Sequence, residues 1–469
     1  AASWYCTGAD TFTVQPAEKE ARGTDVIIKL KEDAQDYAKE HRLRSIIRRH
    51  SDFIPFPIYV GDDQQQVNRQ TAIWRQSPRE VEEQDYVDFY KQLTLDYEPP
   101  MTHAHMVVDA PVQMYALLYV AGSPERSMFS VRREDGLKLF ARKVLIQEYN
   151  KDLLPEYLGF VQGVVDSEDL PLNVSRESVQ SNRVMNQLKK LITAKVFDTL
   201  SEMAEKEPEK YVQFWEGYSR QLKQGVAMEQ LNPEPLHPLL RFHTTAKPDE
   251  WSSLDEYVER MKENQEDIYY IMGDDEHSLM YSPHLDVVRH HDYEVLLMAD
   301  PVDAFMMTRL KEYGEHSLVN VASADLQLPE VEQDQDEAEP DAQPEDEAHA
   351  ALVERFKEQL GDEVSEVRIT DRLSESPARL VDPAGALNQE MQRVYRMLDQ
   401  DFPAPKKVLE INPRHRIIRK LGDLPEEDER VAWIIEQIYA DALLIEGLHP
   451  DPASMIPRIQ KLIESALGE

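Results

Sequence analysis

An acidic turn followed by a helix start carries the residues best suited to chemistry in this sequence. Residues 166–177 read DSEDLPLNVSRE, in which Pro171 ends one element and Ser175 is a good N-cap for the next helix. Arg176 then lies in the first helical turn, where free backbone N–H groups and a guanidinium together suit an anion such as a terminal phosphate. Alternatively, Arg176 only pairs with a nearby carboxylate such as Glu177, and the spacing leaves both interpretations open.

Other catalytic or metal-binding signatures are weak or missing. His103 and His105 alternate on one predicted strand and therefore share a face, as in half of a metal site. No third ligand accompanies them, so we interpret both as ordinary histidines and predict no metal; a metal-dependent hydrolase that uses them is an alternative. The 16 glycines lack the spacing of a phosphate-binding loop, and no nucleophile elbow, H-E-x-x-H motif or EF-hand loop occurs.

The composition narrows the class of protein further. The chain has 469 residues and 89 acidic against 52 basic side chains, which gives a net charge of −37. This charge argues against nucleic acids and anionic membranes as partners. The single cysteine, Cys6, excludes an intramolecular disulfide and suits a reducing compartment, so we expect a cytoplasmic protein. The start, AASW, lacks a signal peptide and is interpreted as the cut end of a longer protein.

The first 69 residues read as a short fragment and a linker. Residues 1–60 contain two predicted strands, at 11–14 and 25–30, followed by a basic amphipathic helix at 36–50. These strands need partners that the fragment does not supply. The polar residues 61–69 are predicted to be a short linker.

Residues 70–328 are predicted to be an α/β domain. Strands are expected at 114–120 and 137–147, and a long helix is expected after Ser175. A β-α-β-α-β order then predicts a small parallel sheet with right-handed crossovers. Its elements are expected at residues 267–272, 283–291, 293–298, 302–313 and 317–321.

An acidic linker, residues 329–349, separates this domain from a mainly helical third unit, residues 350–469. The third unit is predicted to contain helices at 351–360 and 388–398, a strand at 364–370 and two terminal helices. The two terminal helices carry more apolar surface than the unit can bury. A symmetric four-helix dimer interface would bury it. The fold class is therefore α/β, α+β overall, in a multidomain chain. The side chains expected at the dimer interface are Trp433, Ile434, Ile438, Leu444, Ile459, Leu462 and Ile463.

The stretch EYLGFVQGVVDSEDLPLNVSRESVQ, residues 156–180, resembles the signature of the heat-shock protein 90 chaperones. The resemblance extends over essentially all 469 residues, through DTFTV and RGTDVIIKLKED near the start, IWRQSP, and LEINPRHRII near the end. It implies the tail of a gyrase/histidine-kinase-type ATPase domain in residues 1–60, then a middle domain and a C-terminal dimerisation domain. Most of the pocket for ATP with Mg²⁺ is then expected upstream of this chain.

The same resemblance implies roles for particular residues. Arg176 matches an arginine that reaches the γ-phosphate of ATP and stabilises the transferring charge. Asn173 and Gln180 are its companions in the catalytic loop, and Thr13 matches a residue at the nucleotide pocket.

Client binding is implied at two places. Trp74, in IWRQSP, matches a client-contacting tryptophan of the middle domain. An apolar stripe that contains methionine, which adapts to many partner shapes, matches an amphipathic helix facing the cleft between protomers. Ordinary core packing is the alternative for these side chains. The stripe consists of Met391, Val394, Tyr395 and Leu398.

Two departures from the family pattern stand out. Residues 122–129, GSPERSMF, replace an aromatic-bearing loop that braces the catalytic loop in many relatives. The C-terminus lacks the MEEVD and KDEL tails, which favours a bacterial member and argues against tetratricopeptide co-chaperones.

The sequence therefore predicts an ATP-dependent homodimeric chaperone for unfolded or partly folded client proteins. ATP hydrolysis is expected of the intact protein and not of this chain alone. An ATP-independent dimeric scaffold or holdase is the alternative.

Overall fold

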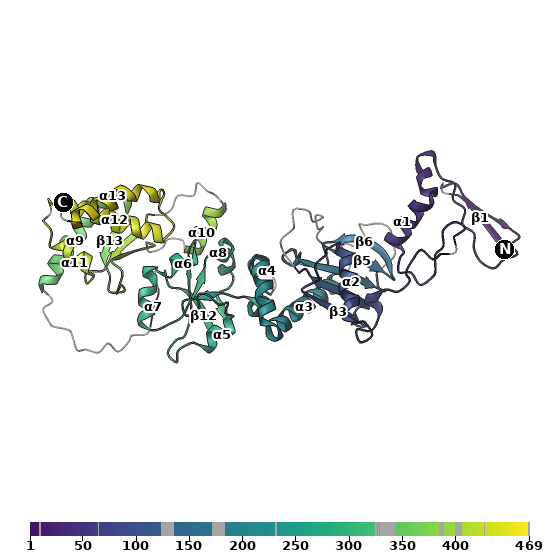
Figure 1. Cartoon of the computed structure of the whole chain (residues 1–469), viewed down its shortest axis with the longest axis horizontal. Coiled ribbons are helices and arrows are strands. Elements are labelled where there is room, and N and C mark those ends of the chain that lie inside the picture. Colours follow the sequence, from purple (N-terminus) through teal and green to yellow (C-terminus); the bar gives the residue numbers. More distant parts are fainter. Residues whose placement is uncertain are drawn as a thin grey trace. The chain divides into compact units, whose positions relative to one another are not determined.

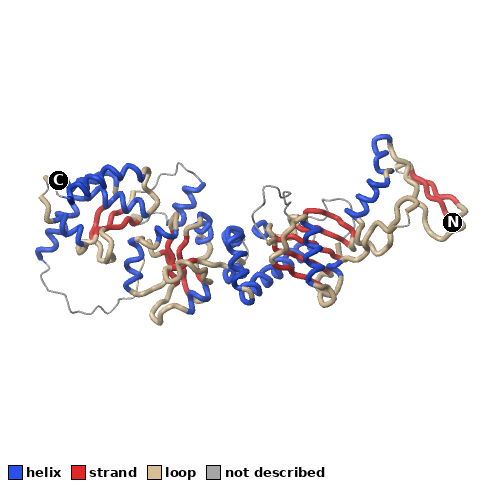
Figure 2. The backbone as a smooth tube through the Cα atoms, in the orientation of Figure 1, coloured by secondary structure: helices blue, strands red, loops and turns tan. Residues whose placement is uncertain are grey.

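The computed structural model describes the chain except residues 9–10, 64, 123–135, 171–182, 230–231, 324–325, 327, 329–342, 384–388, 399–405, 426 and 468–469. It divides into two compact units. The first contains residues 1–73 and 142–146, and the second contains residues 74–141 and 147–469. Helices and mixed sheets recur along the chain (Figures 1 and 2), which confirms the predicted α/β class, α+β overall.

The first unit is built from a hairpin and a helix. Strands β1 (Ala2–Cys6) and β2 (Phe12–Pro16) pair antiparallel, while a 3₁₀ helix, η1 (Glu32–Ala38), precedes α1 (Glu40–His50). The strand predicted at residues 25–30 is wrong, because this segment pairs with no described strand. Its apolar side chains, among them Ile27, are exposed, so the β pattern lacks the neighbour that would make it a strand.

A five-stranded sheet begins the second unit. Its order is β3-β4-β7-β5-β6, with β4 antiparallel to β3 and β7, and with β5 parallel to β7. The single strand predicted at 137–147 is two strands, because Arg142 and Lys143 adopt positive φ and turn the chain. The strands are β3 (Thr102–Val108), β4 (Met114–Val120), β5 (Leu137–Ala141), β6 (Val144–Asn150) and β7 (Val161–Ser167).

One helix precedes this sheet in the chain and two long helices follow it. Helix α2 (Glu83–Thr94) lies against the sheet in Figure 1, and α3 (Arg183–Lys206) runs past β3 and leads into α4 (Pro208–Met228). Leu188, Ile192 and Val196 lie on the buried face of α3, as the helical spacing predicts. Two short 3₁₀ helices complete this part of the chain: η2 (Ile73–Arg75) precedes α2, and η3 (Glu156–Leu158) lies between β6 and β7.

A second sheet follows, in the order β11-β12-β9-β10-β8. Strands β12, β9 and β10 are parallel, which confirms the predicted parallel pairing of these strands. The helix predicted at 302–313 ends early, because a turn at Gly314 pairs the last residues of that range as a short strand. The elements are η5 (Glu234–Leu239), β8 (His243–Thr244), α5 (Leu254–Glu259), β9 (Ile268–Met272), α6 (Glu276–Leu279), η6 (Pro283–Leu285), α7 (Asp286–His290), β10 (Val295–Met298), α8 (Pro301–Met307), β11 (Glu312–Tyr313) and β12 (His316–Asn320).

The last part of the chain packs helices on one face of a three-stranded sheet, β13-β15-β14. Phe356, Leu409 and Ile435 are fully buried in the core between that face and the helices. None of the described helices is both long and apolar enough to cross a membrane. The elements are α9 (Gln343–Leu360), η7 (Gly361–Glu363), β13 (Glu366–Ile369), β14 (Ala378–Val381), α10 (Gln389–Leu398), β15 (Val408–Ile411), α11 (Arg416–Gly422), α12 (Glu429–Ile445), η8 (Pro452–Met455) and α13 (Ile456–Leu467).

Candidate functional site

A buried carboxylate anchors the end of β7, the strand within the signature stretch that precedes the segment bearing Arg176. Asp166 is fully buried, and its Oδ2 accepts hydrogen bonds from the indole N–H of Trp74 at 3.1 Å and from Nε of Arg75 at 2.7 Å. Both donors belong to the IWRQSP motif, 91 or 92 positions away in the sequence. The motif and the signature are therefore joined directly at this point.

Arg75 extends this anchor to the next carboxylate along the chain. Its guanidinium also pairs with Glu168 and lies over the ring of Tyr115, 4.3 Å from the ring centroid. Burial acts to lower the pKa of Arg75, but the hydrogen bonds to Asp166 and Glu168 outweigh it and raise that pKa. The arginine thus stays charged and holds two acidic residues that would otherwise repel each other.

A second set of hydrogen bonds fixes the residues just before the signature loop. The hydroxyl of Ser167 donates to the carbonyl of Gln113 at 2.7 Å, and the backbone N–H of Gln113 donates to the carboxylate of Asp169 at 2.8 Å. Leu170 is buried. The chain is therefore held firmly up to residue 170, and the next described element, α3, begins at Arg183.

The predicted catalytic residues Asn173, Arg176 and Gln180 lie outside the described residues. The structure describes what holds the two ends of their segment, and it does not test their roles. Thr13 lies on β2 in the first unit and is exposed. Its predicted contact with nucleotide stays a prediction.

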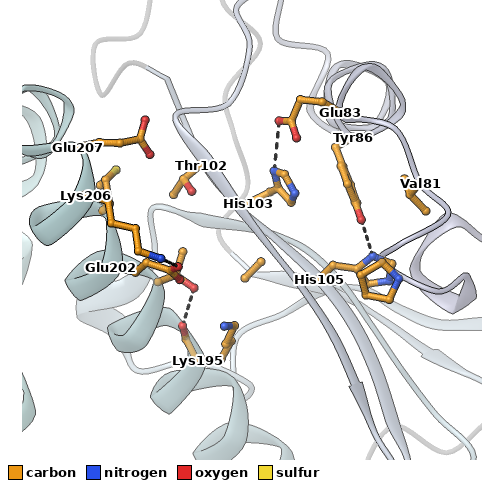
Figure 3. Close-up of a pocket in the computed structure, with 14 residues that line it drawn as sticks. Val81, Glu83, Tyr86, Thr102, His103, His105, Lys195, Glu202, Lys206 and Glu207 are labelled. Carbon is orange, nitrogen blue, oxygen red and sulfur yellow. Dashed lines mark hydrogen bonds and ion pairs between the residues drawn. The ribbon is translucent and has the colours of Figure 1, made fainter.

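The two histidines of β3 line a cavity. His105 is bound on both sides: its Nδ1 lies 2.8 Å from the hydroxyl of Tyr86, and its Nε2 lies 3.1 Å from the carbonyl oxygen of Trp74. His103 stacks on Tyr86 with ring centroids 4.0 Å apart (Figure 3). Among the described residues, no group of three or more His, Cys, Asp or Glu side chains could hold a metal ion.

Trp74 lies in the interior in this structure. Its side chain is fully buried and packs on Phe89 and Phe140, with centroid distances of 5.7 and 5.0 Å. With its N–H on Asp166 and its carbonyl on His105, this residue links the cavity to the end of β7. Its predicted contact with clients is untested, and the geometry observed here gives it a positioning role.

Helix α10 carries the predicted client-binding stripe on a well-anchored support. The hydroxyl of Tyr270 donates to Glu390 at 2.6 Å, and Arg393 donates to the carbonyl of Gly273 at 3.0 Å, so α10 is tied to the β9 end of the second sheet. Val394 is buried and Met391 half-buried, whereas Tyr395 is exposed. The side chain of Leu398 lies outside the described residues.

The predicted dimer residues divide into a buried group and an exposed group. Ile438 belongs to the core beneath α12, with Ile434 packed against it, and Trp433 and Leu462 are half-buried. The ammonium of Lys461 lies 5.2 Å from the ring centroid of Trp433. The exposed residues are Leu444, Ile459 and Ile463, together with Ile456 and Leu467.

The sequence interpretation missed the junction of Trp74, Arg75 and Asp166. The available signal was an arginine beside the tryptophan of IWRQSP and an aspartate inside the otherwise apolar strand pattern VQGVVDS. A buried carboxylate needs a cationic or N–H partner, but which of the chain's many arginines supplies it depends on the tertiary fold.

Comparisons with known proteins match nearly the whole chain. The family model described as "Hsp90 protein" matches residues 60–469. Chaperone protein HtpG of Pseudoalteromonas translucida is 37% identical over 483 residues, covering 98% of this chain and 75% of that protein. Chaperone protein HtpG of Nitratidesulfovibrio vulgaris is 38% identical over 475 residues, covering 99% of this chain and 74% of that protein.

Proposed function

The chain belongs to the Hsp90 protein family and as such is a molecular chaperone, and we propose that it works as a homodimer whose client binding is driven by ATP. The observation that carries the ATP-dependent part is the double anchoring of β7. The IWRQSP motif and the connection before β4 both hold the strand that feeds the segment bearing Arg176.

Arg176 is the residue of this chain that we assign to phosphate. Its guanidinium would bind and orient the terminal phosphate and stabilise the charge that develops on the phosphate oxygens during transfer. Asn173 and Gln180 would add amide donors on the same segment, and Thr13 would lie at the nucleotide. A rigid base for the segment supports this role, because electrostatic stabilisation requires donors that are positioned before the reaction.

Bound ATP would supply the phosphoryl group and the free energy for a conformational cycle. Among the described residues no group of three or more His, Cys, Asp or Glu side chains could hold Mg²⁺, so we assign no metal ligand to them. Movement of the segment would pass to β7 on one side and to α3 on the other, because the segment connects these two elements.

Clients would bind the stripe on α10 through Met391, Tyr395 and Leu398, with Val394 supporting the helix from beneath. Tyr395 offers an aromatic surface with a polar tip, and methionine adapts to clients of different shape. The anchoring of Glu390 and Arg393 to the second sheet supports this assignment, because it fixes in place the helix that carries the stripe.

Client binding is testable with the chain alone, by light scattering from a heat-unfolded protein such as citrate synthase. We expect this chain to suppress aggregation and the double substitution Met391→Glu with Tyr395→Glu to abolish most of that suppression. Tyr281→Glu is the matched control, because Tyr281 is also exposed but lies outside the stripe. Equal suppression by the double variant would contradict the assignment of clients to α10.

An ATP-independent holdase is the second candidate. The exposed apolar residues of α10 and α13 favour it, since they would act without nucleotide. It predicts that nucleotide turnover never depends on Arg176, and this separates it from the proposal above.

A further inference from the structure

Helix α11 and the residues just before it carry positive charge on a strongly acidic chain. Residues 413–422, PRHRIIRKLG, contain four Arg or Lys side chains and no Asp or Glu, whereas the whole chain has a net charge of −37. These four exposed residues, Arg414, Arg416, Arg419 and Lys420, form the basic cluster. Such a local reversal of sign produces a positive potential that attracts anionic groups.

The packing of α11 directs most of the basic cluster away from the core. Ile418 and Leu421 are buried in the hydrophobic core of the last part of the chain. Arg416, Arg419 and Lys420 are spaced three and four residues apart, so they share the other side of the helix. The helix therefore buries one face and presents three cations on the opposite face.

Contacts at both ends hold α11 in place. At its C-terminal end, the guanidinium of Arg355 on the neighbouring helix α9 donates to the carbonyl oxygens of Leu421 at 3.2 Å and Leu424 at 2.9 Å (Figure 1). Before its first turn, the guanidinium of Arg414 donates to the carbonyl of Asp371 at 3.1 Å. The basic cluster thus has a fixed support, which lowers the entropy cost of binding a partner.

The exposed face of α11 carries charges that no described residue compensates. The side chains of Arg416, Arg419 and Lys420 form no hydrogen bond or ion pair with any residue that the structure describes. Like charges at these spacings destabilise a helix, and Arg416 also lies in the first turn, at the positive end of the helix dipole. An anionic partner would relieve this unfavourable arrangement.

We propose that the basic cluster docks an acidic segment of a partner protein, bound as an extended strand with Asp or Glu at every second position. Alternate side chains of an extended segment lie on one side, about 7 Å apart. This distance is close to the spacing of about 5–6 Å between side chains three or four residues apart on a helix. Each guanidinium of the cluster can pair with a carboxylate through charge-assisted hydrogen bonds.

Charge favours a protein segment over a nucleic acid at this surface. The basic cluster spans only residues 414–420, so the phosphates of a longer nucleic acid would extend beyond it and face a chain of net charge −37. A short acidic segment places its charge on the cluster alone. This docking requires neither ATP nor the stripe on α10, and it therefore goes beyond the proposed function.

The test is fluorescence anisotropy of a dye-labelled peptide with glutamate at every second position and serine between, titrated with the chain. We expect saturable binding that weakens as salt is raised from about 0.1 M to about 1 M, because the Debye length falls from about 10 Å to about 3 Å. A peptide with glutamine in place of glutamate should bind at least about tenfold more weakly. Arg416→Gln combined with Lys420→Gln should weaken binding of the glutamate peptide by about the same factor.

The matched control is Arg183→Gln combined with Lys190→Gln, two exposed cations of α3, which changes the net charge equally and should leave binding unchanged. The melting temperature of the α11 double variant should not fall, because the substitution removes a like-charge pair.

Five outcomes overturn the proposal: no saturable binding of the glutamate peptide, equal binding of the glutamine peptide, equal loss of affinity in the two double variants, tighter binding of a single-stranded oligonucleotide than of the glutamate peptide, or a lower melting temperature in the α11 variant. Because no step of this test involves ATP or an unfolded client, its failure would leave the proposed function standing.

Discussion

Asp166 is the residue on which the anchoring of the signature segment depends. It is fully buried and accepts hydrogen bonds from Trp74 and Arg75, and these donors compensate its charge. A buried ion pair contributes little to net stability when it is complete, but removal of one partner leaves the other charge buried and uncompensated.

Asp166→Asn should therefore destabilise β7 locally by about 3 kcal/mol, since Arg75 loses its buried counter-ion. Faster amide hydrogen exchange in β7 would measure this loss. Glu168→Gln is the control, because Glu168 is partly exposed and its loss should cost about 1 kcal/mol or less. Unchanged exchange in Asp166→Asn would show that the anchor is unnecessary.

His105 gives the structure a dependence on pH. Burial lowers the pKa of His105, and the hydrogen bond to the Trp74 carbonyl opposes this only in part. The unfolded chain, with a histidine pKa of about 6.5, then binds the proton more readily than the folded chain does. The contribution of His105 to the free energy of unfolding is therefore fully present above about pH 6.5. It is lost progressively as the pH is lowered below that value.

His105→Gln should flatten this dependence, because glutamine does not titrate. We expect the decrease in melting temperature between about pH 7.5 and pH 5.5 to be smaller in this variant than in the parent chain. His290→Gln, at an exposed helix end, serves as the control and should keep the parent slope. A slope that is identical in all three proteins would rule out His105 as a source of the dependence.

At the scale of elements, β7 requires a glycine at its centre. Gly163 pairs with Leu118 of β4 and has a φ of +153°, and a Cβ added there would lie 2.3 Å from the carbonyl oxygen of Leu117. That oxygen belongs to the backbone of the neighbouring strand, so relief requires the two strands to separate.

Gly163→Ala should thus lower the free energy of unfolding of this sheet by at least about 2 kcal/mol, combining backbone strain with the clash. Thermal unfolding would report it as a lower melting temperature. Gly422→Ala is the matched control, since a Cβ there meets nothing within 4 Å. A Gly163→Ala variant as stable as this control would mean that β4 and β7 adjust freely.

The elements also show where sequence reasoning succeeds. The parallel β12-β9-β10 arrangement was predictable, because its apolar strands alternate with amphipathic helices and the topology rules leave few choices. The segment at residues 25–30 has the same apolar β pattern but no described partner strand, and a strand is defined by its neighbour. Periodicity alone therefore predicts the pattern and not the pairing.

The candidate site was predictable only in part, for a related reason. The phosphate-binding role of Arg176 was predictable from the local chemistry of a helix start together with the family resemblance. The junction of Trp74, Arg75 and Asp166 joins residues about 90 positions apart, and the cavity joins α2, β3 and α3. No local spacing encodes such contacts, because they arise when separate elements pack.

At the scale of the whole molecule, self-association is expected through the C-terminal helices. Helices α12 and α13 pack on each other (Figure 1), and Ile459 and Ile463 of α13 remain exposed, on one helical face four residues apart. Exposed apolar side chains in such a row favour a symmetric interface with a second copy.

Ile459→Asp combined with Ile463→Asp should weaken dimerisation by at least about a hundredfold, since burial of each isoleucine contributes about 1.5–3 kcal/mol. Sedimentation velocity over a range of concentrations would measure the change. Met228→Asp, at an exposed position on α4, is the control and should dimerise as the parent does. A monomeric parent chain, or an unaffected double variant, would contradict the proposed interface.

The central claim is that Arg176 acts on the phosphate of ATP, and one comparison of turnover rates tests it most directly. An ATP-binding domain of the kind that the family resemblance implies would be joined to the N-terminal end of this chain. Steady-state ATP hydrolysis would then be compared between the parent chimera, Arg176→Ala and the control Arg183→Ala, an exposed arginine at the start of α3. Loss of a positioned charge from the transition state predicts turnover at saturating ATP about a hundredfold lower in Arg176→Ala alone. Equal turnover in Arg176→Ala and the parent chimera would contradict the claim and favour an ATP-independent holdase.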